Sequence, residues 1–286
     1  MRRIITSLII AATSLSASAI LPSEVRWSNE TQDTTKITDI LIKAEKQAVS
    51  TPQEHVGFIA RQFIGTPYAP HTLEGSPERL TVNLEQLDCT TFVETVLALA
   101  ITAGEHRTSW RDFIHNLERI RYRNGELNGY SSRLHYISDW IVDNTHRGNF
   151  AEITNRMEQN SYQVKTLDFM SRNRDKYPAL KDSTQWAKIR DVERGYMSHR
   201  FPYLKTRNIT YKPNLNALKD GDAVAFTTKI PGLDVSHLGF IVIENGHPRL
   251  LHASQSAGKV IIDDLSLTEY LKRAKNITGI RIIRLK

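Results

Sequence analysis

The order of apolar and polar positions separates a helical first part of the chain from a strand-rich end. Residues 37–49 and 52–63 repeat apolar side chains at helical spacing, and the second segment opens with a Thr-Pro pair that favours a helix start. Residues 87–100 are apolar on nearly every side after their first turn, which predicts a helix buried at the centre of a domain. Asp88 is well placed as the N-cap of that helix.

After Pro213 the pattern changes to short apolar runs of strand length, and the Asn245-Gly246 pair between two of them is typical of a hairpin turn. The expected strands are residues 223–227, 238–244, 249–254, 260–263 and 277–285. Helices followed by a mostly antiparallel sheet predict an α+β fold. Residues 65–84 form a long loop rich in Gly and Pro, and residues 105–213 read as an insertion of helices and loops.

The N-terminus has the three-part layout of a secretory signal peptide. Two arginines precede an apolar run, and small residues end at Ala19, after which we expect cleavage. The apolar run is too short to span a membrane, and no Cys lies beside the cleavage site to accept a lipid. We therefore divide the chain into a signal peptide (1–19), a leader with an N-terminal helix (20–50) and one catalytic domain (51–286), exported to the periplasm or beyond.

Composition and charge limit the class of protein. The 286 residues are 40% hydrophobic and 24% charged, which excludes a disordered chain, a collagen or a coiled coil. Removing the two arginines of the signal peptide from the formal charge of +7 leaves +5, which suits an anionic surface or substrate. The basic residues are dispersed and the protein is expected to be exported, so we expect no nucleic-acid partner.

The single cysteine is the first candidate for chemistry. In an oxidising compartment, Cys89 cannot form an internal disulfide, so it is either buried and inert or kept for its reactivity. Its place at the start of the predicted buried helix favours reactivity, because free N–H groups and the helix dipole there stabilise an anion. We therefore expect a lowered pKa and a nucleophilic thiolate, with the same N–H groups holding an oxyanion.

Two histidines lie where they could assist the thiol. His237 stands at the mouth of an apolar strand, and His252 lies in the adjoining strand across the hairpin. Strand pairing would bring the two rings close together, with His237 as general base and His252 as the group that orients it. Seven of the other eight histidines, all except His135, read as core or surface residues, and Asp88 is either a cap alone or also a ligand for a substrate amine. Tyr68, on the long loop, either donates its hydroxyl to the substrate or packs.

Five linked motifs resemble the NlpC-type cell-wall cysteine peptidases over residues 52–103 and 215–285. A closer likeness, to the N-acetylmuramoyl-L-alanine amidase-like branch, comes from residues 87–94 and from a motif in the insertion at 132–141. The five motifs are Gly65-x-Pro67-Tyr68, Asp88-Cys89-Thr90-x-Phe92-Val93, Gly221-Asp222-Ala223-Val224-x-Phe226, Ser236-His237-Leu238-Gly239 and His252-Ala253-Ser254.

The resemblance implies a papain-like core, in which the helix that carries the nucleophile packs on the sheet. It makes Cys89 the nucleophile, His237 the base and His252 the orienting residue, and it implies no metal or cofactor. The implied substrate is a muropeptide, with 1,6-anhydro-muramic acid, cut between the lactyl group and L-alanine. The resemblance places Tyr68 and Asp88 near the substrate, and we also expect Ser236 to bind it.

The insertion supplies planar and cationic side chains that could bind a sugar and a carboxylate. Of Tyr130, Arg133, His135 and Trp140, we expect Arg133 to contact the substrate and Trp140 to pack in the core. Three alternatives remain. The same catalytic residues suit a stem-peptide endopeptidase. A zinc amidase lacks support because no H-E-x-x-H motif is present. A non-catalytic wall-binding module would have no use for an oxidisable thiol. We expect a monomer.

Overall fold

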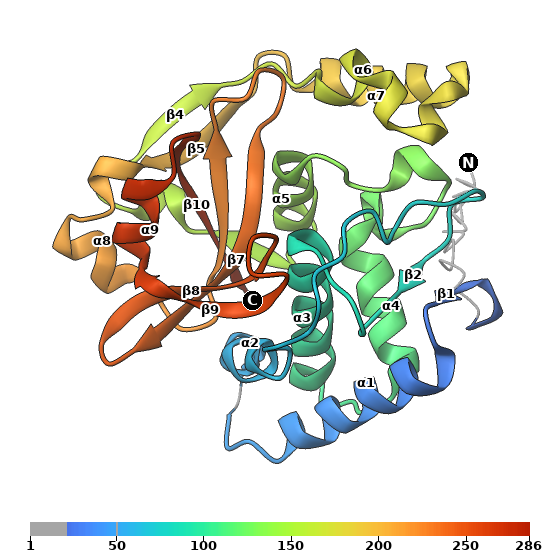
Figure 1. The fold of residues 1–286 in the computed structure, drawn as a ribbon, viewed down its shortest axis with the longest axis horizontal. Coiled ribbons are helices and arrows are strands. Elements are labelled where there is room, and N and C mark those ends of the chain that lie inside the picture. Colours follow the sequence, from blue (N-terminus) through green and yellow to red (C-terminus); the bar gives the residue numbers. More distant parts are fainter. Residues whose placement is uncertain (1–21, 50) are drawn as a thin grey trace, which may run out of the picture.

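An antiparallel sheet and a group of helices lie side by side in the computed structural model, which describes residues 22–49 and 51–286 (Figure 1). The predicted signal peptide, with Ala19, lies outside the described residues. Seven strands follow the order β4-β5-β10-β6-β7-β8-β9, and β3 also pairs with β10. Every pairing in this sheet is antiparallel, so the predicted α+β class is confirmed.

The strands of the large sheet are β3 (Phe150–Glu152), β4 (Ser161–Val164), β5 (Arg200–Lys205), β6 (Ala223–Thr228), β7 (Val235–Glu244), β8 (His247–Ser254), β9 (Lys259–Ser266) and β10 (Ile277–Leu285). A separate parallel pair is formed by β1 (Arg26–Trp27) and β2 (Thr81–Val82). The helices are α1 (Glu30–Glu45), α2 (Pro52–Arg61), α3 (Cys89–Gly104), α4 (Trp110–Arg121), α5 (Ile137–His146), α6 (Phe169–Arg172), α7 (Ser183–Gly195), α8 (Lys212–Ala217) and α9 (Leu267–Arg273).

The central helix α3 connects the two halves of the fold. Its residues from Thr91 to Ala103 are all buried, as the sequence predicts, and α1, α2, α4 and β7 surround it. The ring of Phe92 packs edge-on against Phe240 of β7, with centroids 5.5 Å apart, and against Phe63 just after α2, at 6.1 Å. These aromatic contacts hold the first turn of α3 against the sheet.

The start of α3 is set by a capping box. Asp88 Oδ1 accepts a hydrogen bond from the Thr91 backbone N–H at 2.8 Å, and the Thr91 hydroxyl accepts one from the Asp88 backbone N–H at 2.9 Å. This reciprocal pair satisfies two backbone donors and fixes Cys89 as the first residue of the helix.

The segment predicted to be an exposed leader is largely part of the fold. Helix α1 begins at Glu30, seven residues before the predicted start, and Asn29 caps it. Upstream, β1 pairs with β2 of the long loop. Asp33 is buried and accepts a hydrogen bond from the Leu84 backbone N–H at 2.9 Å. The polar residues at the start of this segment concealed the helix because most of them form its solvent face.

The insertion is also more regular than the sequence suggests. It contributes β3, β4 and β5 to the sheet, so the expectation of helices and loops alone was wrong. These strands are short, and β5 contains Pro202, which weakens the strand pattern. A separate apolar cluster within the insertion includes Tyr136, Leu180 and Phe201. The insertion is thus an extension of the sheet with its own small core.

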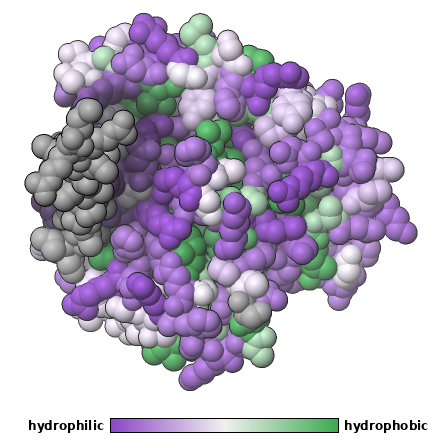
Figure 2. All heavy atoms as spheres, turned by 180° about the vertical axis from the view of Figure 1, so that it is seen from behind, coloured by the Kyte–Doolittle hydropathy of each residue, from purple (hydrophilic) through white to green (hydrophobic). Residues whose placement is uncertain are grey.

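The two faces of the sheet have different covers. Helices α1 to α5 and one sheet face share the main apolar core, whereas α8 and α9 cover the other face (Figure 1). On the face drawn in Figure 2, hydrophobic side chains form small separated groups among hydrophilic ones. No helix within residues 22–49 and 51–286 has the length and apolar character needed to cross a bilayer.

Candidate active site

Cys89 lies where the start of α3 meets β7. The residue is half-buried and packs against the main core. The backbone N–H groups of Leu238, the residue that follows His237, and of Cys89 itself are close enough to the thiol to lower its pKa, and the Thr90 hydroxyl acts in the same direction. Donors of this kind stabilise negative charge on sulfur or on an oxyanion beside it.

The resting thiol is nevertheless neutral. Burial, together with the negative charge of Asp88, raises the pKa of Cys89 to about 11, although the neighbouring N–H groups and the Thr90 hydroxyl act in the opposite direction. The expectation that the helix start lowers this pKa was therefore wrong. The capping residue that starts α3 places a carboxylate beside the thiol, which opposes the effect of the helix dipole.

His237 and His252 are directly hydrogen-bonded. The Nε2 atom of His237 lies 2.7 Å from Nδ1 of His252, and the rings meet edge to face with centroids 4.9 Å apart. The antiparallel pairing of β7 with β8 produces this contact. Gly239 makes it possible, because a Cβ at that position would lie 2.9 Å from the Leu251 carbonyl oxygen and 3.0 Å from Cβ of His252.

Both imidazoles are held in the neutral form. Burial and, to a smaller extent, the neighbouring His252 together lower the pKa of His237 to about 3. Burial also lowers the pKa of His252 to about 4, although Asp263 acts in the opposite direction. The His237 ring packs beside Phe226, with centroids 5.7 Å apart, which helps to exclude water.

Two residues near His252 were missed by the sequence analysis. Asp263 Oδ2 lies 3.7 Å from Nε2 of His252, and the Tyr270 ring lies 5.9 Å from the His252 ring. In the β8–β9 pairing, His252 is opposite Ile261, so Asp263 faces the same side of the sheet two residues further along. Extending the strand alternation into β9 could have identified Asp263, but nothing in the sequence marks Tyr270.

The three residues expected near the substrate have different surroundings. Tyr68 is half-buried and its loop is fixed by a bridge to Leu87. Burial raises the pKa of Tyr68, and so do the nearby Cys89 and Asp88. Asp88 caps α3, and Ser236 is exposed at the start of β7.

A small cavity of about 150 Å³ opens next to the residues that flank Cys89 in the chain. Asp88 and Thr90, the two neighbours of Cys89 in the chain, line it together with Glu74 and Arg133. Arg133 is 6% exposed and already paired, with Nη2 2.8 Å from Glu74 Oε1 and Nε 3.3 Å from Glu78 Oε1. Arg133 therefore lines the cavity while it is ion-paired with two carboxylates of the protein.

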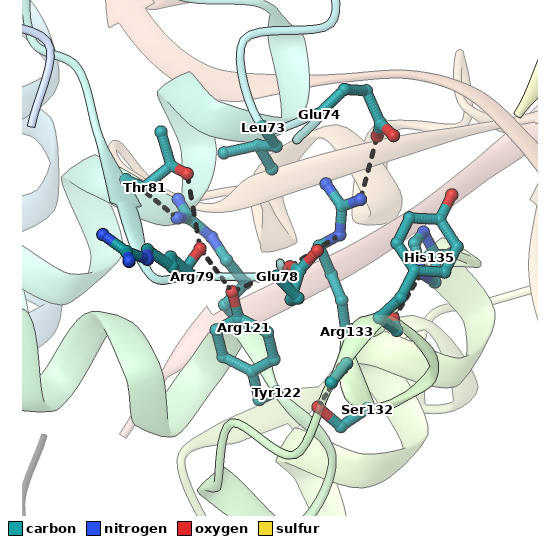
Figure 3. Close-up of polar contacts among 12 residues, drawn as sticks. Leu73, Glu74, Glu78, Arg79, Thr81, Arg121, Tyr122, Ser132, Arg133 and His135 are labelled. Atoms are coloured by element: carbon teal, nitrogen blue, oxygen red, sulfur yellow. Dashed lines mark hydrogen bonds and ion pairs between the residues drawn. The ribbon is translucent and has the colours of Figure 1, made fainter. Parts of the chain in front are cut away.

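Glu94 and Arg121 form a second buried ion pair next to Arg133, with Arg121 Nε 2.6 Å from Glu94 Oε2. Figure 3 shows the carboxylates of Glu74 and Glu78 directed toward Arg133, with Arg121 on the other side of Glu78. These five residues are called the charged cluster below.

The remaining candidates in the insertion pack. Trp140 is 1% exposed and lies against Phe150, with centroids 4.8 Å apart, so the packing interpretation is confirmed. His135 Nε2 is 2.9 Å from the Tyr130 carbonyl oxygen, and its ring lies 4.4 Å from the Tyr130 ring. Within the described part of the chain, no three His, Cys, Asp or Glu residues are grouped to hold a metal ion.

Comparison with known proteins fits this geometry. The model of the N-acetylmuramoyl-L-alanine amidase-like family matches residues 58–280, which include all of α3, β7 and β8. The chain belongs to this family. The match covers more than half of the chain, and it contains the nucleophile candidate, both histidines and the whole insertion.

Two of the solved structures that are similar to this chain come from Bacteroides species. An N-acetylmuramoyl-L-alanine amidase from Bacteroides uniformis is 35% identical with a TM-score of 0.78, and the match covers 82% of this chain and 99% of that one. A Bacteroides fragilis protein provisionally described as a xylanase is 39% identical with a TM-score of 0.74, over 79% and 99% of the two chains.

A Legionella pneumophila protein is similar in fold, at 23% identity and a TM-score of 0.66 over 90% of this chain and 95% of that one. No curated protein matches the sequence. The family and the amidase neighbour show a peptidoglycan amidase-like hydrolase.

Proposed function

We propose that this protein is a cysteine amidase that hydrolyses the bond between the lactyl group of muramic acid and L-alanine in muropeptides. The observation that carries the proposal is the position of Cys89 against the backbone of Leu238, one residue from a His237 ring that is hydrogen-bonded to His252. We place the protein, by this proposal, in the NlpC-type superfamily of cysteine peptidases.

The neutral state of both groups defines the first step. His237 Nε2 is engaged with His252 Nδ1, which leaves His237 Nδ1 to take the thiol proton. In this arrangement His237 carries its own proton on Nε2 and donates a hydrogen bond from it to Nδ1 of His252. The proton of His252 then lies on Nε2, which faces Asp263. As sulfur bonds to the lactyl carbonyl carbon, its proton passes to His237, and the positive ring is stabilised by His252 and Asp263.

The later steps reuse the same groups. The carbonyl oxygen becomes an oxyanion that the N–H groups of Cys89 and Leu238 can stabilise. His237 gives its proton to the departing L-alanine nitrogen, the C–N bond breaks, and a thioester remains on Cys89. Water then loses a proton to His237, attacks the thioester and releases the muramic acid carboxylate with the regenerated thiol.

The proposed substrate is a soluble muropeptide that carries 1,6-anhydro-muramic acid. The amidase name of the Bacteroides uniformis neighbour supports cleavage next to the sugar rather than within the stem peptide. We further propose that the protein acts as a monomer in the periplasm or outside the cell, after removal of residues 1–19. The absence of a membrane-spanning helix among the described residues fits this location.

The test is the identity of the products. The mature protein is incubated with anhydro-muropeptides of defined structure, and the products are weighed by mass spectrometry. Free anhydro sugar with an intact stem peptide is the expected result. A shortened stem would instead identify an endopeptidase, and complete loss of activity with a chelator, restored by zinc, would contradict the cysteine mechanism.

A further inference from the structure

Four aromatic rings, including the two imidazoles of the proposed catalytic centre, contact one another in a closed circle. The His237 ring lies 5.7 Å from the Phe226 ring and 4.9 Å from the His252 ring, measured between centroids. Tyr270 closes the circle, because its ring lies 5.9 Å from His252 and 5.5 Å from Phe226. Tyr270 therefore touches the orienting histidine directly and reaches the proposed base through Phe226.

Hydrogen bonds fix only one side of the His252 ring. Its Nδ1 atom lies 2.7 Å from Nε2 of His237, which is a normal bonding distance. On the other side, Nε2 is buried and makes no hydrogen bond to any residue that the structure describes, since Asp263 Oδ2 is 3.7 Å away. The last torsion of a histidine side chain is soft, so a single hydrogen bond leaves the ring able to tilt.

The Tyr270 ring supplies a second constraint on His252. The planes of the two rings meet at 78°, an edge-to-face arrangement that aromatic pairs favour. A tilt of the imidazole would either press it into the tyrosine ring or open a gap between the two, and both changes cost packing energy. The contact therefore stabilises the orientation in which His252 is hydrogen-bonded to His237.

Tyr270 is held in place by its own helix, α9. Ser266 and Glu269 form a capping box, so the helix begins at a defined residue. Leu267 and Leu271 are buried and belong to the apolar core on this face of the sheet, and Tyr270 packs against the same core. The position of the tyrosine is thus set by the fold before any substrate binds.

The surroundings of the Tyr270 hydroxyl favour its neutral form. Burial raises the pKa of Tyr270, and the nearby Asp263 and Cys89 raise it in the same direction. A neutral phenol adds no charge beside the two histidines, so it does not disturb a proton transfer between them and the thiol. The contacts with His252 and Phe226 are made by the ring, and we therefore assign the effect to the ring rather than to the hydroxyl.

We propose that Tyr270 is a positioning residue for the reaction, because its ring holds His252 in the orientation that accepts the hydrogen bond from His237. The step that depends on this orientation is the transfer of the thiol proton, during which the His237 ring becomes positive and His252 stabilises it. The link to catalysis rests on the proposed amidase function, whereas the orientation of His252 is a property of the free protein.

The first experiment detects the tautomers of the two histidines in the absence of substrate. The full chain is labelled with ¹⁵N-histidine, and the ring resonances are assigned from His237→Gln and His252→Gln. We expect the wild type and Tyr270→Phe to show the proton on Nε2 of both rings. Tyr270→Leu keeps an apolar side chain without a ring, so the two nitrogen shifts of His252 should move toward each other as the tautomers exchange.

The second experiment compares steady-state constants on a muropeptide. Tyr270→Leu should lower kcat by about tenfold and change KM by less than about twofold, because it loosens the orienting residue without removing it. Tyr270→Phe restores the ring and should recover most of this loss. Tyr211→Leu, an exposed tyrosine at the start of α8, is the matched control and should change neither constant.

Three results would overturn the proposal: unchanged nitrogen shifts of His252 in Tyr270→Leu, equal losses of kcat in the Phe and Leu variants, or a rise in KM with kcat unchanged. Circular dichroism verifies the fold, and Tyr270→Met, with the same expected shifts, replaces the Leu variant if that one unfolds. Failure of the amidase function gives a different pattern, because the tautomer exchange would persist while the wild-type protein releases no sugar from muropeptides.

Discussion

The proposed catalytic centre and the charged cluster both hold polar groups largely away from water, but they do so in different ways. At the centre, burial shifts the pKa values of Cys89, His237 and His252 so that all three groups are neutral near pH 7. In the charged cluster, burial raises the pKa of Glu78 and Glu94, but paired arginines oppose this shift, as in the 2.6 Å contact of Arg121 with Glu94.

The difference teaches which region can change its charge during a reaction. A neutral thiol and a neutral imidazole can exchange one proton, and the cost of the resulting ion pair is met as the substrate bond forms. A buried ion pair cannot lose one partner without leaving an unpaired charge behind. The proposed catalytic centre is therefore suited to proton transfer. The charged cluster is suited to holding the wall of the small cavity next to the residues that flank Cys89.

The largest effect should come from the nucleophile. Cys89→Ala should lower kcat on a muropeptide by about 10⁴-fold or more, because no other thiol is present in the chain. The rate of sugar release is followed by liquid chromatography. His247→Ala, an exposed histidine at the start of β8, is the control and should retain full activity. If the Cys89→Ala variant kept its activity, the cysteine mechanism would be excluded.

The next largest effect should come from breaking the charged cluster. Arg121→Met leaves Glu94 buried without its partner, so the free energy of unfolding should fall by about 3–5 kcal/mol. Urea denaturation followed by circular dichroism measures this loss. Arg107→Met breaks an exposed ion pair with Asp112 and should leave the unfolding midpoint nearly unchanged. Similar losses in the two variants would mean that the buried pair has no special role.

A smaller effect is expected at the orienting histidine. His252→Ala should lower kcat by about 100-fold with little change in KM, because the base loses the group that fixes its tautomer and stabilises its positive form. His252→Gln keeps a polar atom near His237 and should recover part of the loss. Steady-state kinetics separate the two constants. A rise in KM alone would instead assign His252 to substrate binding.

The smallest change is expected from pH. A base must be unprotonated, and the pKa of His237 is about 3, so kcat/KM should vary little between pH 7.5 and 5. A histidine with the ordinary pKa near 6.5 would lose about 30-fold over that range. Rates are measured in well-buffered solution at substrate concentrations far below KM. A midpoint near pH 6.5 in the profile of kcat/KM would contradict the neutral pair of histidines.

Acid should also destabilise the fold in that range. The unfolded chain takes up protons on both histidines below about pH 6.5, whereas the native chain resists protonation down to about pH 3 to 4. Stability from these groups is complete above pH 6.5 and decreases as the pH falls toward 3. Circular dichroism at each pH therefore accompanies the rate measurements, so that loss of structure is not mistaken for titration of the base.

The sequence predicts best where a single local signal decides the structure. The apolar segment after Asp88 defines α3, and the Asn245-Gly246 turn defines the hairpin that brings His237 to His252. The pKa of Cys89 was predicted with the wrong sign, because burial and the Asp88 charge depend on tertiary packing. The pairing of Arg133 with Glu74 and Glu78 depends on how a distant loop folds back, which spacing along the chain does not encode.

The short β1–β2 pair connects the N-terminal segment to the loop before β2, whose residues Leu73 and Glu74 line the small cavity. Arg26 of β1 reaches across it, with Nη2 2.7 Å from the Leu73 carbonyl oxygen and Nε 2.9 Å from the Thr81 hydroxyl. Leu73 immediately precedes Glu74 and both line the small cavity, so the shape of this cavity depends on an arginine nearly fifty residues upstream. Related enzymes can consequently differ in substrate selectivity through substitutions in β1, even when every residue that touches the substrate is the same.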